Sequence, residues 1–197
     1  MDSPHPVRAP TRPWATVVVA AAALITFGFA PLADAFIYER SLIFGGQLWR
    51  IWTGHIVHFG SSHLLWDLAV FFPAGCWLER LNPRCARWLY LLGPIIISAV
   101  LLACDPTLER YAGLSGLAMG TLVLLAVIQF TNRNESPWLW AGVLLLAAAK
   151  IVLELRQGAP LFVSDFAHIR NVPLAHLSGI GCALLCWLLL GRTKCLG

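Results

Sequence analysis

The chain has 197 residues, of which 58% are hydrophobic and only 12% charged, and its mean hydropathy is +0.72. Soluble domains carry about 25% charged residues, so this composition excludes an ordinary soluble protein and predicts an integral membrane protein. The net charge of +4 is small and comes from dispersed basic residues. We therefore expect no nucleic-acid partner.

Residues 14–191 carry six apolar segments, between a polar, proline-rich tail at 1–13 and a short tail at 192–197. The segments are 14–32, 62–78, 88–104, 113–130, 138–155 and 172–191. Several are shorter than the ~20 residues of a typical span, so tilt or local bilayer thinning is expected. Residues 33–54 form an amphipathic connection. The sequence predicts one all-α domain with six transmembrane helices.

The distribution of lysine and arginine predicts that both termini are cytoplasmic, because cytoplasmic loops of membrane proteins are enriched in these residues. With the N-terminus inside, the cytoplasmic segments hold eight: Arg8, Arg12, Arg80, Arg84, Arg87, Arg133, Arg192 and Lys194. The opposite side holds five: Arg40, Arg50, Arg110, Arg156 and Arg170. The excess has the expected sign.

This topology brings polar side chains from four segments to one depth near the outer side. The second, fourth and sixth segments begin there, and the fifth ends there. Their polar residues near that side are His63 with Asp67, Ser115, His176, and Lys150 with Glu154. Ionisable groups inside spans are costly and usually face the bundle interior or a wet cavity. We therefore predict a single polar site.

Ser115 and His176 could form a nucleophile–base pair, in which the imidazole accepts the hydroxyl proton and later protonates the leaving amine. Ser115 lies between Gly113 and Gly116, two residues that allow close approach of a neighbouring helix. The alternative is that these small residues only pack two helices together. No carboxylate is an obvious partner for His176 in the sequence, so a serine–histidine dyad is the simpler prediction.

The remaining polar residues have structural alternatives. Lys150 and Glu154 are separated by four residues and are expected to neutralise each other inside their helix, in preference to a direct catalytic role. His63 and Asp67 share a helical face and could point into the cavity, or His63 could make only an interhelical hydrogen bond.

No metal or cofactor is predicted. His55, His58 and His63 do not share a helical face. The six cysteines form no Cys-x-x-Cys pair, so neither a zinc site nor a disulfide framework is expected.

Four motifs together resemble the rhomboid family of intramembrane serine proteases over roughly residues 49–191. In chain order they are Trp49-Arg50; His58, His63-Leu64 and Asp67, which match H-x4-H-x3-N; Gly113-Leu114-Ser115-Gly116, which match G-x-S-G; and Ala175-His176-Leu177-Ser178-Gly179, which match A-H-x-x-G. The resemblance implies a six-helix rhomboid-like bundle.

The resemblance also implies the roles of the site residues. Ser115 would be the nucleophile and His176 the general base. The oxyanion hole would be formed by His63, the residue at position 67 and the Ser115 backbone N–H. The residues next to Ser115, which are Gly113, Leu114 and Gly116, would support it. The chain departs from the family pattern twice, with Asp67 in place of asparagine and Met119 where an aromatic residue often supports the histidine ring.

Within the family, the chain looks most like a rhombosortase. The features that carry this resemblance are its compact size, the segments Trp52–His55 and Gly158–Pro160, and the Lys150–Glu154 pair. That resemblance implies a bacterial inner-membrane protein with its site toward the periplasm. Its substrates would be exported proteins that end in a Gly-Gly motif, an apolar helix and a basic tail, with transfer to an acceptor as well as hydrolysis. One rival interpretation is a non-catalytic rhomboid-like protein that binds transmembrane helices. Another is a transporter, but a chain with only six predicted spans and no matched pair of broken helices argues against it.

Overall fold

The computed structural model describes residues 11–157 and 172–191. Most of the two predicted tails, residues 1–10 and 192–197, lies outside this range, as do residues 158–171 with the segment Gly158–Pro160. The described chain is mainly helical, and one two-stranded antiparallel pairing interrupts the predicted all-α pattern.

The first predicted span is not one straight helix. Helix α1 (Trp14–Gly28) is followed after one residue by α2 (Ala30–Phe36), and the two are bent by 115°. Phe29 between them is extended, with φ −133° and ψ 91°, and a proline stands in the first turn of α2. Because proline is well placed in a first helical turn but not in a helix interior, the apolar run 14–32 divides here.

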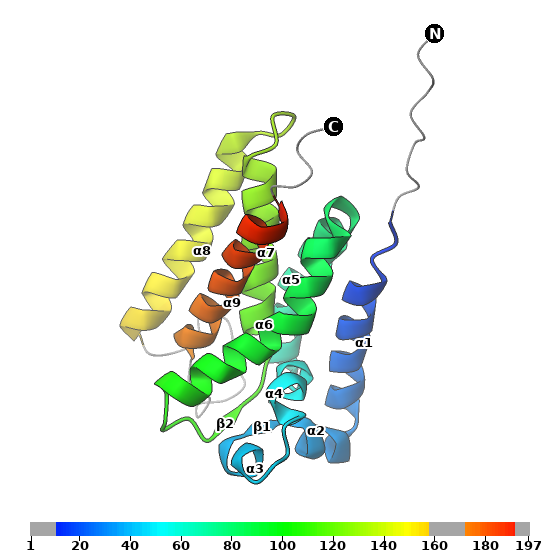
Figure 1. Ribbon diagram of the computed structural model, residues 1–197, viewed down its shortest axis with the longest axis vertical. Coiled ribbons are helices and arrows are strands. Elements are labelled where there is room, and N and C mark those ends of the chain that lie inside the picture. The colour runs from blue at the N-terminus through cyan, green and yellow to red at the C-terminus, as the bar shows by residue number, and fades with distance from the viewer. Residues whose placement is uncertain (1–10, 158–171, 192–197) are drawn as a thin grey trace.

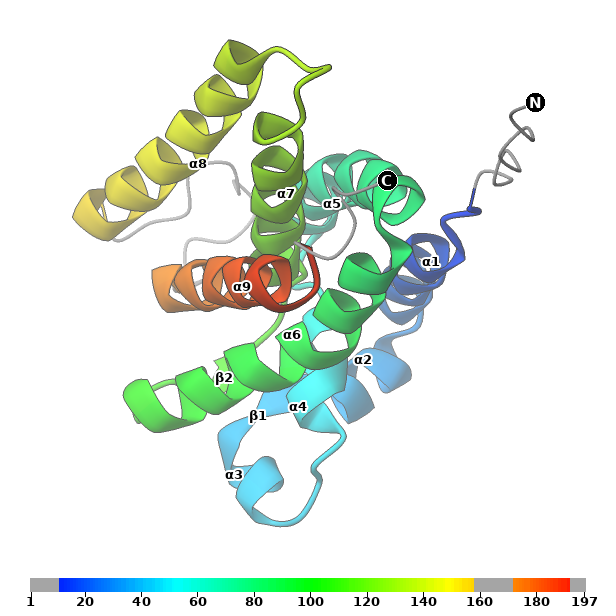
Figure 2. The ribbon, with the colours of Figure 1, turned by 45° about the horizontal axis from the view of Figure 1, so that its top comes forward.

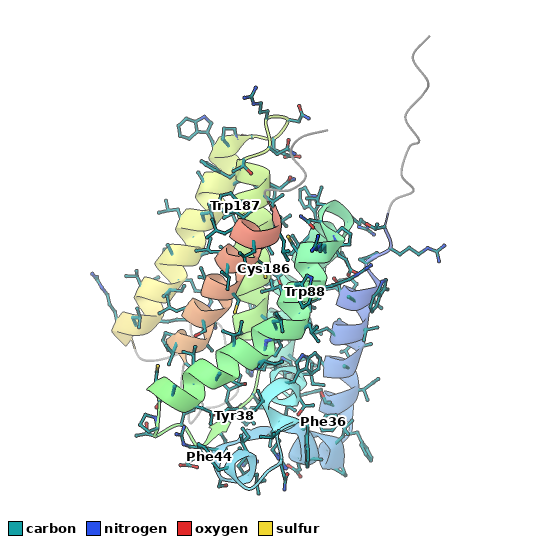
Figure 3. The ribbon with its side chains drawn as sticks, viewed as in Figure 1. Phe36, Tyr38, Phe44, Trp88, Cys186 and Trp187 are labelled. Carbon is teal, nitrogen blue, oxygen red and sulfur yellow. The ribbon has the colours of Figure 1, made fainter. Side chains whose placement is uncertain are left out.

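Short elements then gather at one end of the molecule (Figure 1). They are β1 (Tyr38–Glu39), α3 (Arg40–Phe44), α4 (Arg50–Thr53) and the 3₁₀ turn η1 (Gly54–Ile56). Strand β1 pairs antiparallel with β2 (Arg110–Tyr111), with Tyr38 opposite Tyr111. Figure 3 labels Phe36, Tyr38 and Phe44 at this end. These elements occupy the amphipathic connection that separates the first two apolar segments in the sequence.

Arg50 of the Trp-Arg motif organises this connection. Its guanidinium is buried and donates to the carbonyl oxygens of Asp34 and Ile37 at 3.0 and 2.6 Å and to the Gln47 side chain at 2.8 Å. Arginine presents several donors in a fixed plane. One side chain therefore satisfies several otherwise unpaired acceptors of an irregular segment.

The other apolar segments form longer helices, α5 (Ser61–Leu81), α6 (Pro83–Cys104), α7 (Ser115–Phe130), α8 (Pro137–Gln157) and α9 (Pro173–Cys186) with the π turn η2 (Trp187–Gly191). Within the described residues, three helices are long and apolar enough to cross a membrane: 83–104, 137–156 and 173–190. The bent pair α1–α2 would be a fourth. The count of six spans stays a prediction.

Helix α7 is the centre of the bundle, with α5, α8 and α9 packed around it (Figure 2). Its residues Leu117 and Leu124 are 1% and 0% exposed and belong to one core with Phe71 of α5 and Leu89 of α6. Helix α8 lies at the edge of the bundle (Figure 2), and its Leu145 and Leu146 are exposed. A central α7 places whatever lies at its first turn beside several other helices.

Glu79, near the C-terminal end of α5, binds the N-terminal end of α1. This fully buried carboxylate accepts from the backbone N–H groups of Ala15 and Thr16 at 3.2 and 2.9 Å and from the Thr16 hydroxyl at 3.0 Å. Arg87 Nε lies 3.3 Å from Oε1 of the same carboxylate, the oxygen that also accepts from Ala15. The first N–H groups of a helix have no partner within the helix and attract negative charge, so Glu79 anchors α1 to the bundle.

Candidate active site

The turn before α7 gives Ser115 a specific backbone setting. Gly113 has a φ of +131°, which side chains other than glycine rarely tolerate. Its carbonyl oxygen accepts a hydrogen bond from the Tyr111 hydroxyl at 3.1 Å. Ser115 begins α7 and is partly exposed, while Leu114 before it is fully buried. The Ser115 N–H belongs to the first turn and has no acceptor within the helix, as an oxyanion donor requires.

The first turns of α7 and α9 touch through their backbones. A Cβ placed on Gly116 would come within 2.9 Å of the Ala175 carbonyl oxygen. One on Gly179 would overlap the Gly116 carbonyl group. Since Gly116 follows Ser115 and Ala175 precedes His176, this contact places the predicted nucleophile and base on adjoining turns at one depth.

His176 has a carboxylate partner that the sequence did not indicate. Glu154 of α8 is 2% exposed, and its Oε2 lies 2.8 Å from Nδ1 of His176. Its other oxygen, Oε1, accepts from the Lys150 ammonium one turn earlier. The Lys150–Glu154 pair is therefore present, and the predicted serine–histidine dyad leaves out the carboxylate that contacts His176.

Asp67 lies between two histidines. Its Oδ2 is 3.1 Å from Nε2 of His58 and 3.4 Å from Nε2 of His63. The Leu114 backbone N–H also points to His58 Nε2, at 3.4 Å. The donor and acceptor roles in the contact between His58 and Asp67 depend on which nitrogen of His58 carries the proton. This histidine belongs to the H-x4-H-x3-N motif, but its contact with Asp67 was not predicted.

His63 also lies against the nucleophile turn. A Cβ on Gly113 would come within 2.7 Å of His63 Nε2 and 3.5 Å of Asp67 Oδ2. The structure thus brings His63, Asp67, Ser115 and His176 into one cluster at the ends of α5, α7 and α9.

The Tyr111 phenol, which donates to the Gly113 carbonyl oxygen, lies beside the Ser115 hydroxyl. Burial raises the pKa of this tyrosine, so it is a neutral donor at physiological pH. A hydrogen bond from Ser115 to His176 stays a prediction.

Two other residues lie outside this cluster. His55 is 1% exposed, and its Nε2 lies 3.0 Å from the Ser98 hydroxyl. Burial lowers the pKa of His55 to about 4, so it is neutral at pH 7. Met119 packs against Val123 and Ala147. Glu154, rather than a ring at position 119, is the group that contacts the His176 imidazole.

Within the described residues, no group of three or more histidine, cysteine, aspartate or glutamate side chains has a metal-binding arrangement. The ionisable groups of this site form pairs with one another. The arrangement provides a hydroxyl, an imidazole whose Nδ1 contacts a carboxylate, and the backbone N–H groups of the first turn of α7. This set is suited to acyl transfer.

Comparison with known proteins gives two matches. The model of the Rhomboid domain matches residues 45–193. The rhomboid protease GluP of Bacillus subtilis (strain 168) is 32% identical over 98 residues, which is 49% of this chain. The chain spans about a fifth (19%) of the length of that relative. The domain match covers well over half of the chain and includes every residue of the cluster. The chain therefore belongs to the rhomboid family.

Proposed function

We propose that the protein is an intramembrane serine endopeptidase, with Ser115 as nucleophile and His176 as general base. The observation that carries the proposal is the backbone contact of Gly116 with Ala175, which sets these two residues on adjoining turns. Family membership supports the same activity.

The chemistry proceeds in two halves. Ser115 Oγ attacks the scissile carbonyl carbon as His176 Nε2 takes the hydroxyl proton, and the imidazolium returns this proton to the leaving amine. The carbonyl oxygen carries negative charge in the intermediate and is stabilised by the Ser115 N–H and by His63. Water, or the amine of an acceptor, then attacks the acyl-enzyme and regenerates Ser115.

The finer placement of the protein is part of the proposal. Residues 14–191 form six spans in a bacterial inner membrane, both tails are cytoplasmic, and the site faces the periplasm. The excess of lysine and arginine on the cytoplasmic side supports this orientation. Glu154 lies near the end of α8, whereas Ser115 and His176 lie near the starts of their helices, which supports a shared depth for these residues.

The proposed substrates are exported proteins anchored by a C-terminal Gly-Gly motif, an apolar helix and a basic tail, as in rhombosortase-like processing. Glycine has a low helix propensity, costing about 1 kcal/mol relative to alanine. A glycine pair at the outer end of a transmembrane helix therefore unwinds readily and exposes a carbonyl to Ser115.

Changing the Gly-Gly pair of such a substrate to Leu-Leu is expected to reduce the cleavage rate at least tenfold, because two glycine-to-leucine changes remove about 2 kcal/mol of unwinding tendency. Cleavage is measured with purified protein and substrate in liposomes. A matched control substrate keeps the Gly-Gly pair and carries a Leu-Leu pair one turn deeper in its helix. Its cleavage rate is expected to equal that of the original substrate. Equal cleavage of all three substrates would exclude glycine recognition while leaving the protease proposal intact.

Asp67 provides a test of the oxyanion site. Asp67→Asn is expected to retain substantial activity, because an amide keeps a donor of the same shape between His58 and His63. Asp67→Leu is expected to lose on the order of 10²-fold in kcat, the usual effect of removing an oxyanion donor. The measurement is kcat for both variants on one substrate, with thermal unfolding as the check on folding. Full activity of the leucine variant would remove Asp67 from the site, and an inactive asparagine variant would show that its acidity is required.

A further inference from the structure

Glu154 contacts the catalytic base without being part of the family motifs. It belongs to α8, whereas His176 begins α9, and the two side chains are 2% and 6% exposed. The distance from Oε2 to Nδ1 is 2.8 Å, within the range of a charge-assisted hydrogen bond. A buried, short contact of this kind restricts the imidazole more than a solvent contact would.

We propose that Glu154 is a positioning residue that fixes the tautomer and ring orientation of His176. The inference rests on the proposed protease function. A carboxylate can only accept, so Nδ1 of His176 carries the proton in this contact. Nε2 is then the unprotonated nitrogen, the one that must receive the proton of Ser115. The same carboxylate stabilises the imidazolium that forms when the proton arrives, as the third member of a serine–histidine–acid triad does.

Lys150 directs the carboxylate. Its ammonium holds Oε1, which leaves Oε2 for His176. The Lys150 side chain is 26% exposed, so its charge is partly solvated while Glu154 is buried. A buried carboxylate without a partner is unfavourable, and the adjacent cation keeps it ionised at a lower cost. The two contacts of Glu154 therefore support each other.

The other buried carboxylates of the described chain have different partners. Asp67 contacts His58 and His63, and Glu79 holds the N-terminus of α1. The Nδ1–H group of His176 donates to Glu154. The positioning role is thus specific to one carboxylate.

The test uses the purified full chain and two readouts. One is the rate at which a small fluorophosphonate labels Ser115, which requires an activated serine but no substrate helix. The other is kcat and KM for cleavage. In Glu154→Gln, Lys150 still donates to the oxygen of the new amide, so the NH₂ group faces His176. A donor at Nδ1 selects the wrong tautomer, and the labelling rate and kcat are expected to fall by about 10²- to 10⁴-fold, with KM nearly unchanged.

The double variant Lys150→Met, Glu154→Gln separates positioning from simple structural support. Without the lysine, the amide can turn its oxygen toward Nδ1 and restore the productive tautomer. The double variant is expected to be about tenfold more active than Glu154→Gln, the equivalent of one recovered hydrogen bond. If Glu154 served only packing, the second substitution would add damage instead.

Glu79→Gln is the matched control, because it neutralises an equally buried carboxylate away from the site. It is expected to lower the unfolding temperature while the labelling rate per folded molecule stays that of the unchanged protein. Normal labelling of Glu154→Gln, or a double variant no faster than the single, overturns the positioning role. Failure of the unchanged protein to label would instead reject the protease proposal itself. If Glu154→Gln does not fold, the folded double variant is compared with Lys150→Met, Glu154→Met, which offers Nδ1 no acceptor. Labelling about tenfold faster in the glutamine double variant supports the role, and equal labelling rates overturn it.

Discussion

Ser115→Ala is expected to abolish cleavage and fluorophosphonate labelling while leaving the protein folded in the membrane. The hydroxyl is the nucleophile that attacks the scissile bond in the proposed mechanism, and losing a catalytic serine in a triad enzyme costs on the order of 10⁶-fold in kcat. Ser115 is partly exposed, and the core contacts of α7 come from residues such as Leu117 and Leu124. His176→Ala is expected to behave alike, and the double variant no worse, because the pair acts as a unit.

Ser178→Ala is the control for this pair of variants. Ser178 lies two residues after His176, and its hydroxyl donates to the Leu174 carbonyl oxygen of its own helix at 2.7 Å. Activity should be unchanged, since this bond lies within α9. Substantial cleavage by Ser115→Ala, measured on a reconstituted substrate, would end the serine protease interpretation.

Gly179→Ala is expected to destabilise the protein and to inactivate the molecules that still fold. The added methyl group would overlap the backbone of Gly116, and no rotamer change can relieve a contact between two backbones. Overpacking typically costs 1–3 kcal/mol. The helices must separate to admit the methyl group, and a displacement of about 1 Å between reacting groups can cost 10²-fold in rate. Thermal unfolding and labelling rate measure the two effects.

Gly181→Ala tests whether the effect comes from the contact rather than from the helix. Gly181 lies on the same helix, is exposed, and has no atom within 4 Å of an added Cβ. Alanine has the higher helix propensity, so this variant should be as stable as the original or slightly more stable. Equal behaviour of the two variants would show that α7 and α9 do not depend on close contact.

The sequence predicted the apolar helices and the family well, because both depend on local patterns. The Rhomboid match confirms the family inferred from the four motifs. The segments 88–104 and 138–155 lie within α6 and α8 of the structure. The common depth of Ser115 and His176 could be anticipated, because the fourth and sixth segments begin on the same side of the membrane in the predicted topology.

The contacts between helices could not be read from the sequence. Lys150 and Glu154 are separated by four residues, so the sequence shows them as partners of each other. That the second oxygen of Glu154 reaches His176, 22 positions later, depends on how α8 and α9 pack. Similarly, a run of apolar residues does not reveal that the chain turns at Phe29, because hydropathy carries no information on direction.

The Lys150–Glu154 pair also matters for how the protein is made. Chains emerge from the N-terminus first, so α8 can enter the bilayer before α9, and with it His176, has been synthesised. A charged residue such as lysine at the centre of an inserting helix costs about 2.5–3.5 kcal/mol. Because the lysine and the glutamate lie one turn apart on one helix, each supplies the other's counter-charge during insertion. We therefore expect Lys150 to neutralise Glu154 while α8 enters the membrane, and His176 to contact this carboxylate only after α9 has docked.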